Sequence, residues 1–124
     1  MKKQYFSSCH SLGELLAARA KDNGPQIFAY FKDQVMTLGQ FDADSNRLAN
    51  ALVQKGIRRG QKVAIISHTN LDYLVCEFAI FKVGAVCVPL NCLLKSHELS
   101  YQLDNADVVL AFVHRNYLDE FVAA

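Results

Sequence analysis

Four histidines are the first residues of this sequence to consider for chemistry, because imidazole is the usual general base near neutral pH. We expect His68 to follow a buried strand directly, whereas the other three lie near expected helix starts or strand ends: His10, His97 and His114. A histidine in such a loop is more often a solvated or capping residue than a base. We therefore predict no catalytic histidine.

Four cysteines could supply thiolates or metal ligands: Cys9, Cys76, Cys87 and Cys92. They form no C-x-x-C pair, and no histidine stands at zinc-finger spacing from them. Cys76 and Cys87 lie in strongly apolar segments, where a thiol behaves as a small hydrophobic side chain. The spacing predicts four reduced thiols and no metal site.

Phosphate-binding and carboxylate motifs are the remaining candidates. The sequence contains no G-x-G-x-x-G, no Walker A pattern and no G-x-S-x-G, and its glycines stand singly. A phosphate could bind backbone N–H groups after His68-Thr69-Asn70, but a simple helix cap by Thr69 or Asn70 is the preferred interpretation. Asp42 and Asp44 face different sides of an expected helix. We thus assign no catalytic, cofactor-binding or metal residue.

The first part of the chain is predicted to form a helix, a hairpin and a second helix. Ser11 begins an S-x-x-E capping box, and the helix that follows should run to about Lys21. Residues 26–31 and 35–37 indicate two short antiparallel strands. Thr37 begins a second capping box for a helix whose apolar face includes Phe41, Leu48, Ala49, Leu52 and Val53, ending at Gly56.

The second part alternates strands and helices. Strands are expected at 63–67, 85–89 and 108–113, with helices at 71–83, from the N-cap Ser96 onward, and at 116–124. In the strand expected at 63–67, residues 63–66 are all apolar, as in a parallel strand buried on both faces. The fold class is therefore α/β: a parallel sheet flanked by helices, with a βαβαβ core preceded by a helix and a β-hairpin.

Length and composition limit the class of protein. With 124 residues, 52% of them hydrophobic, the chain fits one domain over residues 1–124 and is too apolar for disorder. Thirteen basic and twelve acidic side chains argue against nucleic acid as a partner. The longest stretch without charge, 83–94, is shorter than the roughly 18 residues that span a bilayer, and no export signal is evident. We expect a cytoplasmic protein with no transmembrane segment.

Several stretches, in this order, resemble the adenylate-forming enzymes, the superfamily of acyl-CoA synthetases, luciferases and peptide-synthetase adenylation domains. Residues 81–91, FKVGAVCVPLN, resemble the second core motif of that family. Residues 36–41 resemble the first, with Gly39 where the family usually has Tyr, and residues 56–64 resemble the turn after it, with Gln61 where Asp is commoner. Residues 45–52, Asn70 with its helix, and residues 98–103 complete a match over nearly the whole chain.

The resemblance implies a parent enzyme that activates a carboxylic acid with ATP and Mg²⁺ and passes the acyl group to a thiol such as coenzyme A. The single Gly84-Ala85 step and Asn91 are more similar to acid–CoA ligases than to peptide synthetases. The family's phosphate loop, ribose-binding Asp and catalytic Lys come later in the chain and have no counterpart here. We therefore expect an N-terminal scaffold that is inactive alone and needs the remainder of the ligase chain.

Two other interpretations stay open. A truncated family member could act as a non-catalytic binding or self-association module, for example as a homodimer that covers exposed apolar surface. An independent small α/β enzyme or nucleotide-binding domain is the third interpretation.

Overall fold

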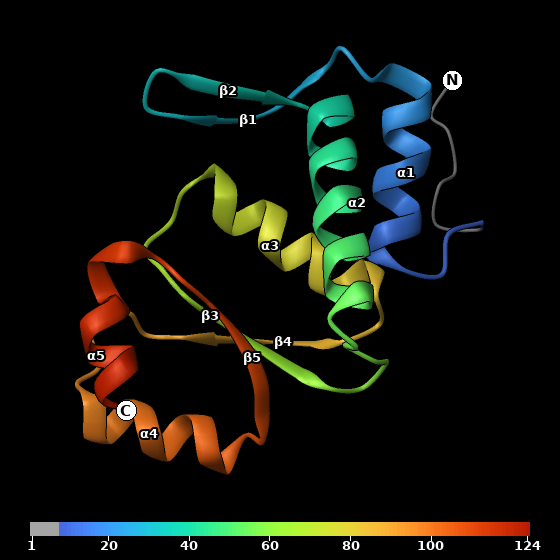
Figure 1. Cartoon of the computed structure of the whole chain (residues 1–124). Helices are drawn as coiled ribbons and strands as arrows, with labels where there is room; N and C mark the ends of the chain where they lie inside the picture. The colour runs from blue at the N-terminus through green and yellow to red at the C-terminus, as the bar shows by residue number, and fades with distance from the viewer. Residues whose placement is uncertain (1–7) are drawn as a thin grey trace.

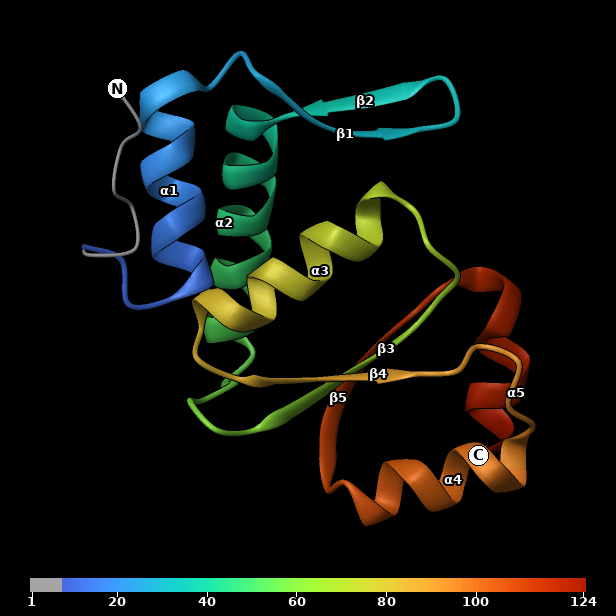
Figure 2. The same ribbon diagram turned by 180° about the vertical axis from the view of Figure 1, so that it is seen from behind.

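The computed structural model describes residues 8–124 as a three-stranded sheet between two helical layers, with a separate hairpin (Figures 1 and 2). Helices α1, α2 and α3 lie on one side of the sheet, and α4 and α5 lie on the other. The elements are α1 (Leu12–Asn23), β1 (Ile27–Phe31), β2 (Gln34–Thr37), α2 (Leu38–Gln54), β3 (Lys62–Ile66), α3 (Leu71–Lys82), β4 (Val86–Leu90), α4 (Ser96–Asn105), β5 (Val108–Val113), a 3₁₀ turn (Arg115–Tyr117) and α5 (Leu118–Ala123).

The parallel sheet has the strand order β4-β3-β5, and the predicted α/β class is confirmed. Strand β3 pairs in parallel with both neighbours, and Val63, Ala64, Ile65 and Ile66 have at most 1% of their surface exposed. Both faces of β3 are buried because a layer of helices covers each side of the sheet. The uninterrupted apolar run in the sequence indicated this burial. The strand bounds differ from the predicted ones by at most one residue at β3 and β4.

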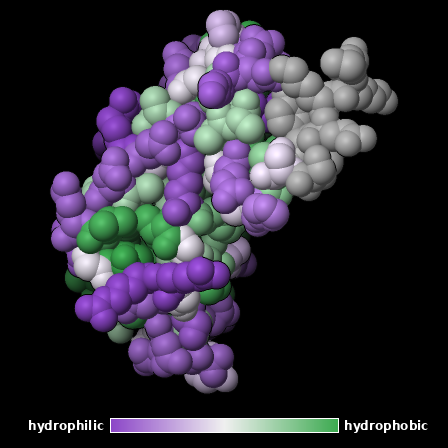
Figure 3. All heavy atoms as spheres, turned by 90° about the vertical axis from the view of Figure 1, so that its right-hand side faces the viewer, coloured by the Kyte–Doolittle hydropathy of each residue, from purple (hydrophilic) through white to green (hydrophobic). Residues whose placement is uncertain are grey.

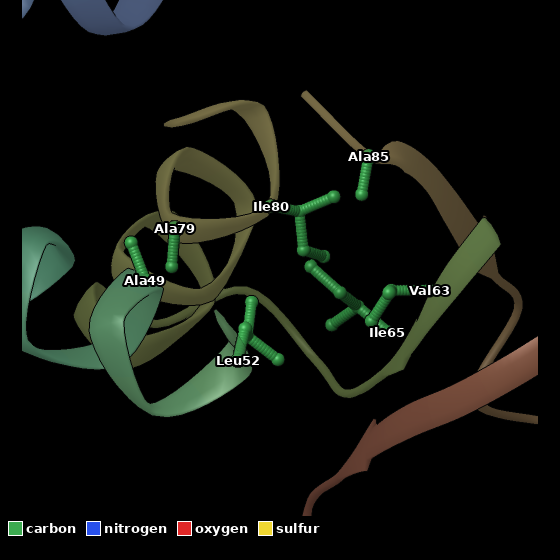
Figure 4. Packing of buried hydrophobic residues seen from close by; sticks show 7 residues of the cluster. All are labelled: Ala49, Leu52, Val63, Ile65, Ala79, Ile80 and Ala85. Carbon is green, nitrogen blue, oxygen red and sulfur yellow. The ribbon is translucent and has the colours of Figure 1, made fainter. Parts of the chain in front are cut away.

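Two apolar clusters join α1, α2, the hairpin and the sheet, and α3 contributes to both. In the first, α2 and α3 pack on the sheet through Ala49, Leu52, Val63, Ile65, Ala79, Ile80 and Ala85 (Figure 4). The second joins α1, the hairpin and α2 through Leu16, Met36, Leu38 and Phe41, with Phe78 of α3 packed against it. The ring centroids of Phe41 and Phe78 are 4.7 Å apart in an edge-to-face contact. A helix buried on two sides explains why the sequence of α3 is apolar over most of its circumference.

Local signals in the first half produce the predicted elements. Thr37 and Gln40 complete the expected capping box, since the Thr37 hydroxyl accepts from Gln40 N at 3.1 Å and the Gln40 side chain accepts from Thr37 N at 2.9 Å. At α1, Ser11 caps Glu14 N as predicted, but the Glu14 carboxylate accepts from His10 N, at 2.7 Å. Gly56 follows the C-terminal end of α2 and adopts the left-handed conformation, with φ of +87°.

Two predictions about single residues are wrong. Val53 was expected on the apolar face of α2 but is 59% exposed. Successive helical residues are about 100° apart, so Leu52 faces α3 and the sheet while Val53 points away from them. Lys95, rather than Ser96, is the N-cap of α4, and Ser96 is its first helical residue. The Ser96 amide donates to Glu120 Oε2 of α5 at 2.9 Å, which ties the two helices on this face together.

The surface seen from the right-hand side of Figure 1 is mostly polar. Hydrophobic residues interrupt it in the lower half of this face, directly above a polar band (Figure 3). Within residues 8–124, no helix combines the length and the apolar character needed to cross a bilayer.

Candidate functional site at the carboxyl edge of the sheet

The loops that follow β3, β4 and β5 leave the same edge of the sheet, because the three strands are parallel. In open α/β sheets this edge is where ligands usually bind. His68 follows β3, Cys92 follows β4 and His114 follows β5. The edge therefore collects side chains that lie far apart in the sequence.

Asn70 caps α3, and the loop before it is held by the same side chain. Its Oδ1 accepts from Tyr73 N at 2.8 Å, while its Nδ2 donates to the Ser67 hydroxyl at 3.2 Å and to the His68 carbonyl at 3.1 Å. The expected helix cap is confirmed and is Asn70 rather than Thr69. The cap already uses the Tyr73 amide, one of the backbone donors that a phosphate at this helix start would need.

His68 and His114 meet at this edge, which the sequence interpretation missed. Their ring centroids are 4.4 Å apart, edge to face, and His68 Nδ1 lies 3.3 Å from the Tyr117 hydroxyl. His114 Nδ1 accepts from Asn116 N at 3.2 Å and so caps the 3₁₀ turn. The signal that could have found this pair is that each histidine follows a strand of one parallel sheet within two residues.

Three groups have raised pKa values: the Tyr117 phenol and the thiols of Cys76 and Cys87. A hydrogen bond with the Cys92 side chain, followed by burial and the Cys92 charge, raises the pKa of Tyr117. Burial, then the charge of Asp72, raises the pKa of Cys76 to about 11, and burial raises that of Cys87 to about 11. A thiol is nucleophilic only as its thiolate, so these two cysteines serve as packing residues, as predicted from the sequence.

A pocket of about 350 Å³ opens between α3 and the carboxyl ends of β3 and β5. Ile65 and Phe112 form part of its apolar wall, and Asp72, His114 and Arg115 contribute polar groups of both signs. Across residues 8–124, no three histidine, cysteine or carboxylate side chains come close enough together to hold a metal ion.

The aspartates considered from the sequence do not form a pair. Asp42 accepts a hydrogen bond from Lys82 Nζ at 2.7 Å, whereas Asp44 pairs with Arg47. Each carboxylate has its own cation, as expected for two side chains on different faces of α2. Arg58 and Arg59 are exposed, in agreement with the sequence interpretation.

Comparison with known proteins agrees with this architecture. Residues 16–124 match the AMP-binding enzyme family. The chain is 32% identical over 106 residues to the 3-oxocholest-4-en-26-oate–CoA ligase of Rhodococcus rhodochrous, covering 85% of this chain and 19% of that protein. It is also 32% identical over 108 residues to tyrocidine synthase 2 of Brevibacillus parabrevis, covering 87% of this chain and 3% of that protein.

Solved structures of CoA ligases have the same fold. The anthranilate CoA ligase AuaEII, in complex with anthranoyl-AMP, superposes with a TM-score of 0.87 at 25% identity, covering 92% of this chain and 22% of that chain. The N-terminal domain of FACL13 from Mycobacterium tuberculosis gives 0.80 at 28% identity, covering 92% and 30%. The chain thus spans about a fifth of the length of the CoA ligases it matches, 19% for the Rhodococcus enzyme. On its motifs, its fold and a match over residues 16–124, this chain belongs to the AMP-binding enzyme family.

Proposed function

We propose that this chain is the N-terminal scaffold of an ATP-dependent acid–CoA ligase and is not active alone. The observation that carries the proposal is the family match over residues 16–124 in a chain spanning 19% of the length of the CoA ligases. The whole enzyme would use ATP and Mg²⁺ to convert a carboxylic acid into an acyl adenylate and would pass the acyl group to coenzyme A. The remainder of the ligase chain would supply the catalytic, nucleotide-binding and metal-binding residues.

The polar groups at the carboxyl edge support a structural role. Asn70 caps α3, and His114 caps the 3₁₀ turn. Both side chains therefore fix the conformation of a loop, which is a structural role and agrees with a scaffold. We further propose that residues 1–124 behave as one domain, because α3 packs into both apolar clusters and couples them.

The proposed partner is the remainder of the ligase chain, covering apolar surface that the described residues leave open. Leu93 is 75% exposed, Val122 74% and Val109 52%. Among the strands of residues 8–124, β4 and β5 each pair with β3 alone, so each has one unpaired edge. We propose the cytoplasm as the compartment, supported by four cysteines that form no disulfide.

The experiment is exchange of radiolabelled pyrophosphate into ATP in the presence of Mg²⁺ and a panel of aliphatic and aromatic acids. The chain alone should show no exchange above the buffer blank. A chimera in which residues 16–124 replace the matching segment of the Rhodococcus ligase should catalyse exchange. A second chimera carrying Phe41→Ala, which removes a fully buried ring, should lose activity through misfolding. Exchange by the isolated chain would overturn the scaffold proposal.

A second candidate function is self-association without catalysis, favoured by the exposed Val109 on the edge strand β5. A homodimer in which these edges meet would bury both the strand edge and its apolar side chains. Sedimentation velocity over a hundredfold concentration range distinguishes the two candidates. A concentration-dependent dimer that Val109→Lys converts to monomer supports self-association, and a monomer throughout supports the scaffold alone.

A further inference from the structure

His114 holds the turn through which the chain passes from β5 into α5 (Figure 1). Its amide donates to the Ile66 carbonyl at 2.9 Å, and its own carbonyl accepts from Tyr117 N at 2.9 Å. The ring adds a third bond, because Nδ1 accepts from Asn116 N at 3.2 Å. Of these three hydrogen bonds, the one made by the ring is the one that a proton can break.

The contact with Asn116 fixes the protonation state of the His114 ring. A backbone N–H can only donate, so Nδ1 must carry a lone pair and the proton of the neutral ring lies on Nε2. In the imidazolium form both ring nitrogens carry a proton, and Nδ1 can no longer accept. Because His114 is half-buried, water can deliver that proton. Protonation therefore sets two N–H groups against each other and removes the cap of the 3₁₀ turn.

His68 lies beside His114, but its own contact survives protonation. The two ring centroids are 4.4 Å apart. His68 Nδ1 lies 3.3 Å from the Tyr117 hydroxyl, which can donate to a neutral ring or accept from a protonated one. Of these two histidines, His114 is therefore the one whose protonation costs a hydrogen bond.

The groups around His114 also act on its imidazolium form. The titratable or charged side chains near it come from the 3₁₀ turn, the loops after β3 and β4, and α3: Arg115, Tyr117, His68, Cys92, Asp72, Tyr73 and Cys76. Arg115 and a protonated His68 would repel a cation at His114, whereas Asp72, the one carboxylate lining the 350 Å³ pocket, would attract it. The imidazolium is thus disfavoured at the cap and favoured on the pocket side.

We propose that His114 is a proton-controlled cap that releases the turn between β5 and α5 when the pH falls. Histidine changes its charge between about pH 8 and 5, so the cap is intact with the neutral ring and lost with the imidazolium. His114 and Arg115 both line the pocket at the carboxyl edge, so the release loosens one wall of that pocket. Helix α5 stays tied to α4, because Glu120 Oε2 still accepts from Ser96 N at 2.9 Å. The change is therefore confined to the turn and does not rest on the ligase proposal.

Exchange of the Asn116 amide with water, measured by NMR in the 124-residue chain at pH 8.0 and pH 5.5, tests the cap. Each rate is compared with the intrinsic rate at the same pH, which gives a protection factor. We expect the protection factor to fall about fivefold on acidification, equivalent to the roughly 1 kcal/mol of a helix N-cap. The Ser96 amide, which Glu120 binds, should keep its protection.

Two substitutions at His114 separate the cap from its titration. His114→Asn keeps an acceptor, since asparagine is among the best N-caps and its side-chain oxygen does not titrate. The Asn116 amide should then have equal protection at both pH values. His114→Ala supplies no acceptor, so protection should be low at both.

The matched control is His97→Asn, which replaces an exposed histidine of α4 that does not line the pocket. It should retain the fivefold fall, and so should His68→Gln. Circular dichroism establishes that each variant is folded before its exchange is measured. Three results would overturn the proposal: equal protection of Asn116 at both pH values in the unsubstituted chain, a fall that persists in His114→Asn, or a fall that either His97→Asn or His68→Gln abolishes.

Discussion

Lys82 Nζ lies 2.7 Å from Asp42 Oδ1 and joins the end of α3 to α2. The same ammonium group donates to the Asp42 carbonyl at 3.2 Å and to Asn46 Oδ1 at 2.7 Å. The Lys82 side chain is only 10% exposed, and that of Asp42 is 21% exposed. This cation is therefore hydrogen-bonded to three acceptors where little water reaches it.

Lys82→Met should lower the free energy of unfolding by about 2 kcal/mol. Methionine keeps most of the apolar stem but leaves the Asp42 carboxylate partly buried without its cation. Urea unfolding followed by circular dichroism measures the change. The control is Arg47→Met at the exposed Asp44–Arg47 pair, which should cost less than about 0.5 kcal/mol. Equal losses in the two variants would contradict a special role for the Lys82 contact.

Gly84→Ala should destabilise the fold more than Gly56→Ala. Both glycines have positive φ, +74° and +87°, so each alanine costs about 1 kcal/mol of backbone strain. A Cβ at Gly84 would also lie 3.1 Å from Arg59 Cγ, whereas a Cβ at Gly56 would meet nothing within 4 Å. Thermal unfolding compares the two variants. Arg59→Ala should remove the excess cost at Gly84, and an excess that persists in that background would exclude the Arg59 contact as its cause.

Cys76 and Cys87 should resist alkylation in the folded protein. Their pKa values of about 11 leave few thiolates at pH 8, and labelling by iodoacetamide should accelerate about tenfold per pH unit up to pH 10. Because folding raises both pKa values above 9.0, the ordinary value of a cysteine thiol, folding stability should be lost as the pH rises from about 9 toward 11. Mass spectrometry of the labelled peptides gives the rates, with urea-denatured protein as the control. Equal labelling of folded and denatured protein would contradict the burial of these thiols.

Asn70→Ala should cost about 1 kcal/mol of folding stability, since it removes the acceptor for Tyr73 N at the start of α3. Thr69→Ala is the matched control, because Thr69 is exposed and adjacent but Asn70 holds the cap. Amide hydrogen exchange should show faster exchange of Tyr73 in the first variant alone. Similar exchange in both variants would show that Asn70 does not protect this amide.

Signals that act within one turn of helix predicted the structure well. Thr37 and Gln40 are three residues apart, so their capping box could be identified from residue types alone. The Glu14 carboxylate accepts from His10 N rather than from Ser11 N, and the S-x-x-E motif does not specify which of these neighbouring amides it will bind. Ser96 was misplaced by one residue, because the Glu98 carboxylate accepts from Lys95 N at 3.1 Å and Lys95 is the N-cap although its residue type does not favour that position.

The carboxyl edge shows where prediction from sequence stopped. His68 and Tyr117 are separated by 49 positions, and their contact depends on the register of β3 against β5. Periodicity identifies each strand but does not specify which strands are neighbours or which residues face each other. The apolar groove between α1 and β1 could not be predicted for the same reason, because α1, the hairpin, α2 and α3 all contribute to its lining.

The strand order β4-β3-β5 also has a consequence for how the chain acquires its structure during synthesis. The central strand is made first, and both of its partners follow it in the chain. A nascent chain that has just completed β3 presents Val63 and Ile65 with no neighbouring strand, and the sheet closes only when Val113 has emerged. Pairings between such distant segments form slowly and leave apolar surface open to aggregation in the meantime. On the ribosome, the interval between synthesis of Ile66 and of Val113 is therefore when this chain most needs a chaperone.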